Sequence, residues 1–192
     1  MYKEHSPSIQ ALAMSEQGVV KVVDFVLSTI NRHFDQTSIV LNSLYYDGIE
    51  NCRFFSGQQK RGLEYIRSTA QRYTALSIGH LNPIDKVKAF LEIPGLGIPK
   101  AGFCVQLLYG QSGCLDVHNL RRAGLDAKVF RTPTSTAALT DRLVAYHAVI
   151  DSMGGTGSLW DSWCILVAAR YPKIWKSAEH VSAYHCQCLG LL

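Results

Sequence analysis

The amino-acid sequence predicts an all-α protein. Apolar residues recur at three- and four-residue spacing through long segments, which is typical of helices that bury one face. Asparagine, proline and glycine stand where such helices would begin and end. No segment shows the alternation of apolar and polar residues that predicts a strand. The length of 192 residues suits one domain with a sizeable core.

The expected elements follow the chain in order. Residues up to about Ser15 are expected to be loosely ordered, and a first helix then runs from Glu16 to Phe34. Later helices are expected at Ser38–Tyr46, at Gln58–Leu76, from Pro83, from Pro99 to Tyr109, from Asp116, at Thr132–Met153, at Ser158–Tyr171 and from Ser177. Glycine predicts turns at residues 45–48 and 154–157.

The segment from Ile93 to Arg122 organises the rest of the chain. Gly95 and Gly97 predict a tight turn in which both residues allow a positive φ, so that backbone N–H groups can approach an anion closely. An apolar helix follows and ends at Gly110. Asp116 then opens the next helix, and aspartate in that position is commonly a plain N-cap.

The net charge of the chain is +4, and an excess of positive charge of the same size lies in and around this segment. Seven basic side chains between residues 86 and 131 stand against three acidic ones, and the basic ones are Lys86, Lys88, Lys100, Arg121, Arg122, Lys128 and Arg131. A basic cluster beside backbone N–H donors suits a phosphate backbone. An ordinary solvated surface has the same charge pattern, so charge alone leaves both interpretations open.

This order of helix, glycine turn, apolar helix, loop and carboxylate resembles the helix-hairpin-helix DNA glycosylases. The matching residues are Pro94-Gly95-Leu96-Gly97, Tyr109-Gly110 and Asp116. Asp116-Val117-His118 is most similar to the 8-oxoguanine DNA glycosylase branch, in which a histidine follows the aspartate by two positions. The resemblance implies two helical lobes with a DNA-binding groove between them. Residues 83–122 would form the hairpin motif and catalytic loop, and residues 1–40 and 132–192 the second lobe.

The resemblance further implies that the protein binds double-stranded DNA and removes a damaged or modified base. The carboxylate of Asp116 would stabilise the positive charge that builds on the sugar, or would orient a water molecule. DNA contacts are implied for Gly95, Leu96, Gly97, Ile98, Lys100, His118, Arg121 and Arg122. The candidates for a wedge that fills the gap left by the flipped base are Gln58, Gln59, Tyr45 and Tyr46.

Lys100 separates two forms of this reaction. Bifunctional relatives carry a Schiff-base lysine two residues after the second hairpin glycine, a position that Pro99 occupies here. Lys100 lies one residue later, and one residue turns a helix position by about 100°, which a long side chain recovers only in part. Hydrolysis without strand cleavage is therefore expected, with a lyase using Lys100 as the alternative. A non-catalytic DNA-binding module and a relative that recognises an altered base without removing it are further alternatives.

Cysteine usage bears on cofactors and compartment. Six cysteines behind an N-terminus without a signal-peptide pattern indicate reduced thiols in the cytoplasm, nucleoid or nucleus. Some relatives bind an iron–sulfur cluster through four closely spaced C-terminal cysteines, but only Cys186 and Cys188 lie near the end here, so no cluster is expected. A zinc site that adds His185 to these two is the alternative, and a monovalent cation at the hairpin carbonyls is compatible with the resemblance. No membrane span is expected, and a monomer is expected.

Overall fold

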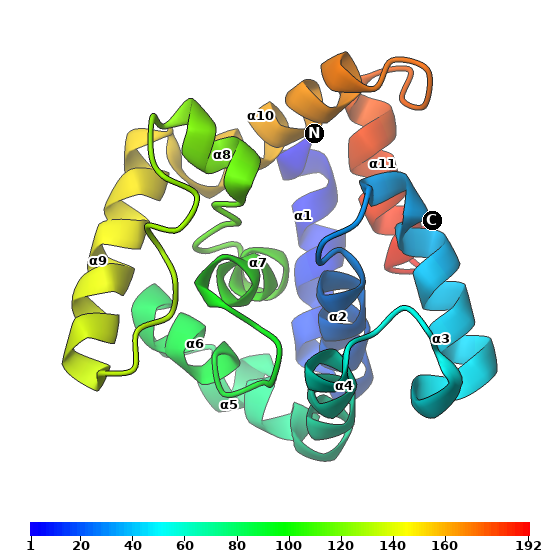
Figure 1. Ribbon diagram of the computed structural model, residues 1–192, viewed down its shortest axis with the longest axis horizontal. Helices are drawn as coiled ribbons and strands as arrows, with labels where there is room; N and C mark the ends of the chain where they lie inside the picture. The colour runs from blue at the N-terminus through cyan, green and yellow to red at the C-terminus, as the bar shows by residue number, and fades with distance from the viewer.

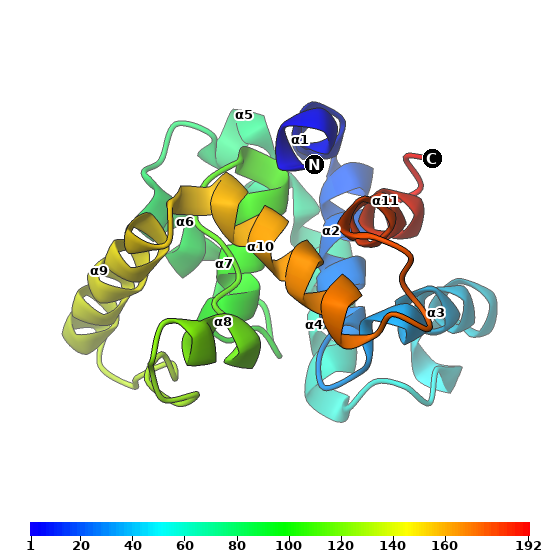
Figure 2. The same ribbon diagram turned by 90° about the horizontal axis from the view of Figure 1, so that it is seen from above.

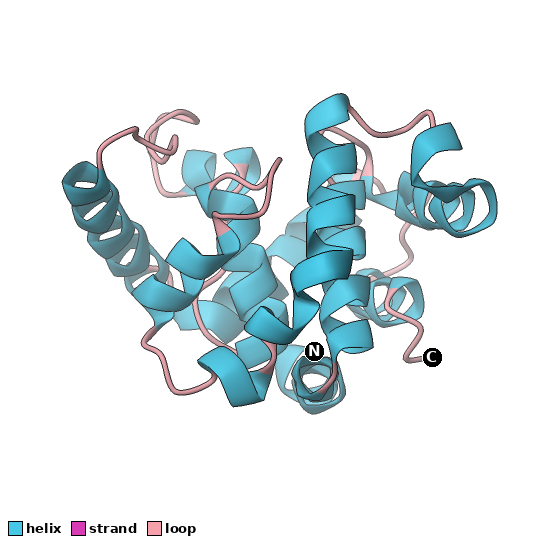
Figure 3. Cartoon of the chain, turned by 90° about the horizontal axis from the view of Figure 1, so that it is seen from below, coloured by secondary structure: helices cyan, strands magenta, loops and turns pink.

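The computed structural model describes all residues from Met1 to Leu192. It contains helices and no β-strand (Figure 3), so the all-α prediction is confirmed. The α-helices are α1 Tyr2–Gln10, α2 Glu16–Ser28, α3 Thr37–Asn51, α4 Gly57–Thr69, α5 Ala75–Ile78, α6 Pro83–Phe90, α7 Ile98–Tyr109, α8 Val117–Arg122, α9 Thr136–Ser152, α10 Gly155–Arg170 and α11 Ala178–Cys188. Short 3₁₀ helices lie at η1 Ala11–Met14, η2 Phe34–Gln36 and η3 Ala70–Tyr73. None of these helices combines the length and apolarity that crossing a lipid bilayer requires.

Helix α7 occupies the centre of the molecule. Figure 1 views it end-on with α2 beside it, and nine of its twelve residues are buried. It packs against α1, α2 and α6, while α10 crosses above it and α9 and α3 lie at opposite edges (Figures 1 and 2). A helix that is apolar on nearly all sides must be enclosed in this way.

Local start and stop signals position the central helices as expected. The Asn82 side chain accepts a hydrogen bond from the Asp85 N–H at the start of α6. Gly110 ends α7 in the left-handed conformation, with φ 65°. Gly95 has φ 88°, whereas Gly97 has φ −96° and ψ 174°. The expected positive φ is therefore found at Gly95 only, and Gly97 is extended because it is the N-cap of α7.

The N-terminal residues correct one expectation, because they form α1 and η1 rather than a loose segment. Pro7 lies inside α1, which weakens the helical signal in the sequence. Tertiary contacts hold this helix in place. The Tyr2 N–H donates to Asp161 Oδ1 over 2.8 Å, and the Tyr2 ring lies 5.8 Å from the Trp160 ring.

Helix α2 corrects a second expectation, because it ends at Ser28 rather than Phe34. The Ser28 and Thr29 hydroxyls donate to the Asp24 and Val26 carbonyls, and Asn31 then takes φ 57°. Residues 29–33 consequently leave the helical path and form a loop before η2.

Other boundaries shift while the buried faces remain as expected. Helix α3 continues to Asn51 with a kink at Gly48 in place of a turn, and the expected helix at 58–76 divides into α4, η3 and α5. Its predicted apolar face is nevertheless buried throughout, at Leu63, Ile66, Ala70 and Tyr73. Helix α9 begins only at Thr136, where the Ser135 hydroxyl caps it. Helix α10 begins at Gly155, inside the expected glycine turn.

Candidate functional site

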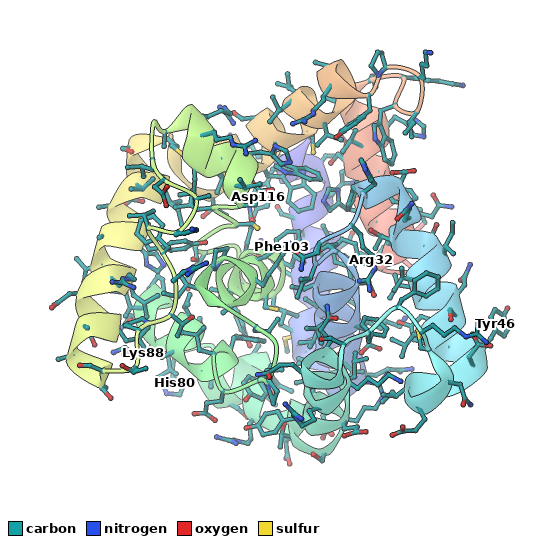
Figure 4. The ribbon with its side chains drawn as sticks, in the orientation of Figure 1. Arg32, Tyr46, His80, Lys88, Phe103 and Asp116 are labelled. Atoms are coloured by element: carbon teal, nitrogen blue, oxygen red, sulfur yellow. The ribbon has the colours of Figure 1, made fainter.

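A cavity of about 630 Å³ lies where the loop after α2 meets α7, α8, α10 and α11. Asp116 and Lys100, the two predicted catalytic residues, both line it. Figure 4 places Asp116, Phe103 and Arg32 around this central region. The fold thus brings together side chains from five separate segments of the chain.

The carboxylate of Asp116 accepts three N–H donors. Its Oδ1 accepts from the backbone N–H groups of His118 and Asn119 over 3.0 and 2.9 Å, which is the predicted N-cap of α8. Its Oδ2 accepts from the indole Nε1–H of Trp163 on α10 over 3.0 Å. An acceptor surrounded by donors suits an ionised carboxylate. The side chain is fixed in orientation while part of it faces the cavity.

The loop before Asp116 is held by buried polar side chains. The Tyr146 hydroxyl on α9 donates to the Gly113 carbonyl over 2.5 Å and accepts from the Leu115 N–H over 3.0 Å. The Gln106 side chain accepts from the Cys114 N–H over 3.2 Å. Buried hydrogen bonds of this kind are costly to break, so they fix the backbone that leads to the carboxylate.

Lys100 extends into the same cavity from the first turn of α7. Its Nζ donates to the Thr29 hydroxyl over 2.9 Å and lies 5.6 Å from the centre of the Phe103 ring. Burial raises the pKa of the nearby Cys114 thiol to about 12, and the positive charge of Lys100 opposes that shift. The thiol is therefore neutral, and the ammonium group is the basic feature of this wall.

Aromatic rings form most of the remaining wall. They come from η2, α7, α10 and the segment between α10 and α11, and comprise Phe34, Phe103, Trp160, Trp163, Tyr171 and Trp175. His185 lies among them, with its ring centre 4.2 Å from Trp160 and 4.4 Å from Phe34. Flat rings around a cavity of this size suit a flat, partly apolar ligand.

The glycine turn presents free backbone donors. The N–H groups of Gly95 and Gly97 have no acceptor within the chain, and both residues are partly exposed. The Leu96 N–H donates to the Ile93 carbonyl, and the side chains of Leu96 and Ile98 are buried. Among the predicted DNA contacts, the turn can therefore offer backbone groups only.

The predicted basic cluster is only partly on the surface. Arg121 and Arg122 are exposed on α8, as are Lys128 and Arg131 in the following loop. Lys86 is an exception, because it is buried and donates to the carbonyl of Leu81 and to Gln111. It is a structural residue rather than a surface cation.

His118 lies at the rim of the cavity, with Nδ1 3.4 Å from an Arg170 guanidinium nitrogen. Of the candidates for the wedge, Gln59 cannot reach DNA in this conformation, because its side chain is buried and forms the capping box of α4 with Ser56. Tyr46 is 89% exposed but lies at the outer edge of α3, far from Asp116 (Figure 4).

All six cysteines are free thiols, and no three His, Cys, Asp or Glu side chains lie close enough together to hold a metal ion. The Nδ1 of His185 is 3.0 Å from the Val181 carbonyl of its own helix.

Sequence reasoning missed three contributors to the cavity. Residues 29–34 were expected to continue a helix, Trp163 was expected only as an apolar residue of a helix, and His185 was considered only as a zinc ligand, whereas all of them line the cavity. The polar triplet Asn31-Arg32-His33 inside an otherwise apolar segment was the available signal for the loop. The indole contact with Asp116 joins residues 47 positions apart and leaves no local pattern.

Comparisons of the chain with protein-family models, curated proteins and solved structures give no match.

Proposed function

We propose that this protein is a DNA glycosylase that takes a damaged or modified base out of duplex DNA and hydrolyses its N-glycosidic bond. The observation that carries the proposal is the position of Asp116, whose carboxylate stands at the start of α8 on the wall of an aromatic cavity. In this proposal α6, the turn at residues 91–97 and α7 act as a helix-hairpin-helix, and the cavity lies between two helical lobes.

The proposed chemistry depends on charge. As the base leaves, positive charge develops on the sugar, and a fixed carboxylate stabilises that charge in a site with little water. The three N–H donors to Asp116 hold the carboxylate without a compensating cation on either oxygen. The negative charge therefore remains available to the sugar or to an attacking water molecule.

The cavity supports the proposal by its size and its walls. A volume of about 630 Å³ is within the range of small-molecule sites and accommodates a flipped nucleoside. Stacking of a base on aromatic side chains contributes about 1–3 kcal/mol per base, which offsets part of the cost of leaving the helix. The walls thus provide the contacts that an extruded base requires.

The proposed DNA surface surrounds the turn. The free N–H groups of Gly95 and Gly97 would bind phosphate oxygens, because backbone donors in a glycine turn form a favourable anion site. Arg121 and Arg122 on α8 would neutralise neighbouring phosphates, which makes binding sensitive to salt. His118 at the cavity rim would contact the phosphate beside the flipped nucleotide.

Replacing Asp116 with asparagine tests the proposal. Asparagine is also a good N-cap, so the Asp116→Asn variant keeps α8 while it loses the charge. Duplexes that carry 8-oxoguanine, uracil, thymine glycol or 5-hydroxymethyluracil are incubated with protein and then treated with alkali. We expect base release to fall by about 100-fold or more while DNA binding persists. The matched control is Asp126→Asn, which removes an exposed carboxylate that caps a loop turn.

Three outcomes are distinguishable. Undiminished base release by Asp116→Asn refutes the mechanism. Tight, base-selective binding without release by the unaltered protein indicates recognition without excision. Equal binding of all duplexes without release indicates a non-catalytic DNA-binding module.

A second candidate is a glycosylase with lyase activity, and the position of Lys100 favours it. Its Nζ lies in the same cavity as Asp116 despite the one-residue offset from the expected lysine position. Borohydride trapping on abasic DNA tests this candidate. A lyase predicts an adduct that Lys100→Ala abolishes and that Lys88→Ala, which lies far from Asp116 in Figure 4, retains. Absence of a Lys100-dependent adduct leaves hydrolysis alone.

A further inference from the structure

His185 combines almost complete burial with access to the cavity. Its side chain is 1% exposed, yet it lines the cavity beside Trp160 and Phe34. These two rings lie against it at centre distances of 4.2 and 4.4 Å and are tilted by 41° and 38°, and Trp163 lies 5.4 Å away at 71°. Aromatic rings therefore crowd the imidazole, and its ring nitrogens are the atoms that can hydrogen-bond to a ligand.

The hydrogen bonds of His185 show which of its ring nitrogens is free. Nδ1 lies 3.0 Å from the Val181 carbonyl, which is an acceptor only, so Nδ1 must carry the hydrogen. Burial lowers the pKa of His185 to about 3, so the ring is neutral at pH 7. Nε2 then carries no hydrogen and has a free lone pair, and no group of the chain donates a hydrogen bond to it.

We propose that Nε2 of His185 accepts a hydrogen bond from a ring N–H of the bound base, so that the cavity selects bases that carry such a donor. Nε2 of His185 is not among the fully buried side-chain atoms that lack a partner, so it remains accessible from the cavity, where a ligand with a matching donor can bond to it. The inference rests on the proposed function, because it identifies the class of base that the site accepts.

Lys100 further restricts the class of base that the cavity would accept. Its ammonium group faces the same cavity, and its positive charge reaches the imidazole of His185. The Lys100 ammonium as a donor and Nε2 of His185 as an acceptor face the same cavity, and together they complement a base in which a ring N–H adjoins a carbonyl. Guanine, hypoxanthine, uracil, thymine and their oxidised derivatives have this group, whereas adenine and cytosine, when attached to a sugar, have no ring N–H.

Binding of methylated free bases tests the inference without DNA or catalysis. The probes are 9-methylhypoxanthine against 1,9-dimethylhypoxanthine, and 1-methyluracil against 1,3-dimethyluracil. Each pair differs by one methyl group on the ring nitrogen that would donate. Quenching of tryptophan fluorescence reports occupancy, because Trp160 and Trp163 line the cavity. We expect the N–H member of each pair to bind at least tenfold more tightly.

Two variants separate hydrogen bonding from shape. His185→Phe keeps an aromatic ring but has no acceptor, and we expect it to bind both members of a pair equally. His185→Gln places an amide oxygen near the position of Nε2, and we expect it to retain the preference. A preference that survives in His185→Phe is steric and overturns the inference. Absence of saturable binding by either N–H probe also overturns it.

The test is independent of base excision. In the Asp116→Asn background the N–H preference should persist while excision is lost. If the unaltered protein shows the preference but releases no base from any duplex, the proposed function fails and the recognition by His185 stands. If it releases bases without regard to a ring N–H and His185→Phe discriminates as well as the unaltered protein, the recognition fails and the glycosylase stands.

Discussion

Acid should destabilise this protein through His185, and the size of the effect follows from its burial. The imidazole lies among Trp160, Phe34 and other rings, where a charged form is poorly solvated. Burial is the main cause that lowers its pKa from 6.5 to about 3, and the positive charges of His5 and Lys100 act in the same direction. The hydrogen bond to the Val181 carbonyl opposes the shift only in part.

The sign of the effect is fixed by which state takes up the proton first. As the pH falls below 6.5, the unfolded chain protonates at His185 while the folded chain does not. The folded state therefore has its full stability above pH 6.5 and loses it progressively toward pH 3. The loss from this residue is about 2 kcal/mol between pH 7 and pH 5, and about 5 kcal/mol once complete.

Urea unfolding at pH 7 and pH 5 measures the effect in the unaltered protein and in His185→Phe. Other titrating groups contribute to both proteins, so the difference between their pH dependences isolates His185. We expect the free energy of unfolding to fall by about 2 kcal/mol more in the unaltered protein. His185→Gln, which also lacks a titrating ring, should follow the phenylalanine variant. Equal pH dependence in all three proteins would refute the neutral, buried imidazole.

Two further predictions concern single contacts. Trp163→Phe keeps the aromatic wall but removes the N–H donor to the proposed catalytic carboxylate, so kcat for base release should fall by about 10- to 100-fold. The control is Trp160→Phe, which should change kcat little because the Trp160 indole donates to Ser182 instead. Gly62→Ala places a methyl group against the Pro94 carbonyl of the turn and should lower the free energy of unfolding by about 1–3 kcal/mol, measured with urea. Gly57→Ala, which meets open space, should be neutral or slightly stabilising, and equal effects at both glycines would contradict the packing of α4 on the turn.

The sequence predicted features whose cause lies within a few residues. Asn82 before Pro83, Gly110 after an apolar run and Asp116 before α8 each satisfy local backbone groups, and each lies where expected. The end of α2 was missed because Ile30 and Phe34 continue the apolar spacing beyond it, while hydroxyl groups and the left-handed residue Asn31 end the helix. Apolar periodicity reports burial, and a buried loop residue satisfies the same pattern as a buried helical one.

Position 116 shows why a carboxylate at the start of a helix was easier to predict than the contacts that hold its loop in place. The sequence indicates a carboxylate at the start of a helix, which needs only Asp116 and its next neighbours. The distance between Asp116 and α7 depends on close packing of the backbone. A Cβ added at Gly102 of α7 would lie 2.5 Å from the carbonyl oxygen of Gly113. The same carbonyl accepts a hydrogen bond from the Tyr146 hydroxyl on α9. Tyr146 is more than 30 residues away, so no spacing rule connects it to this loop. The carboxylate and the hydroxyl that fixes its loop are therefore separable by mutation, and a catalytic defect in a Tyr146 variant would arise from displacement of the loop rather than from lost charge.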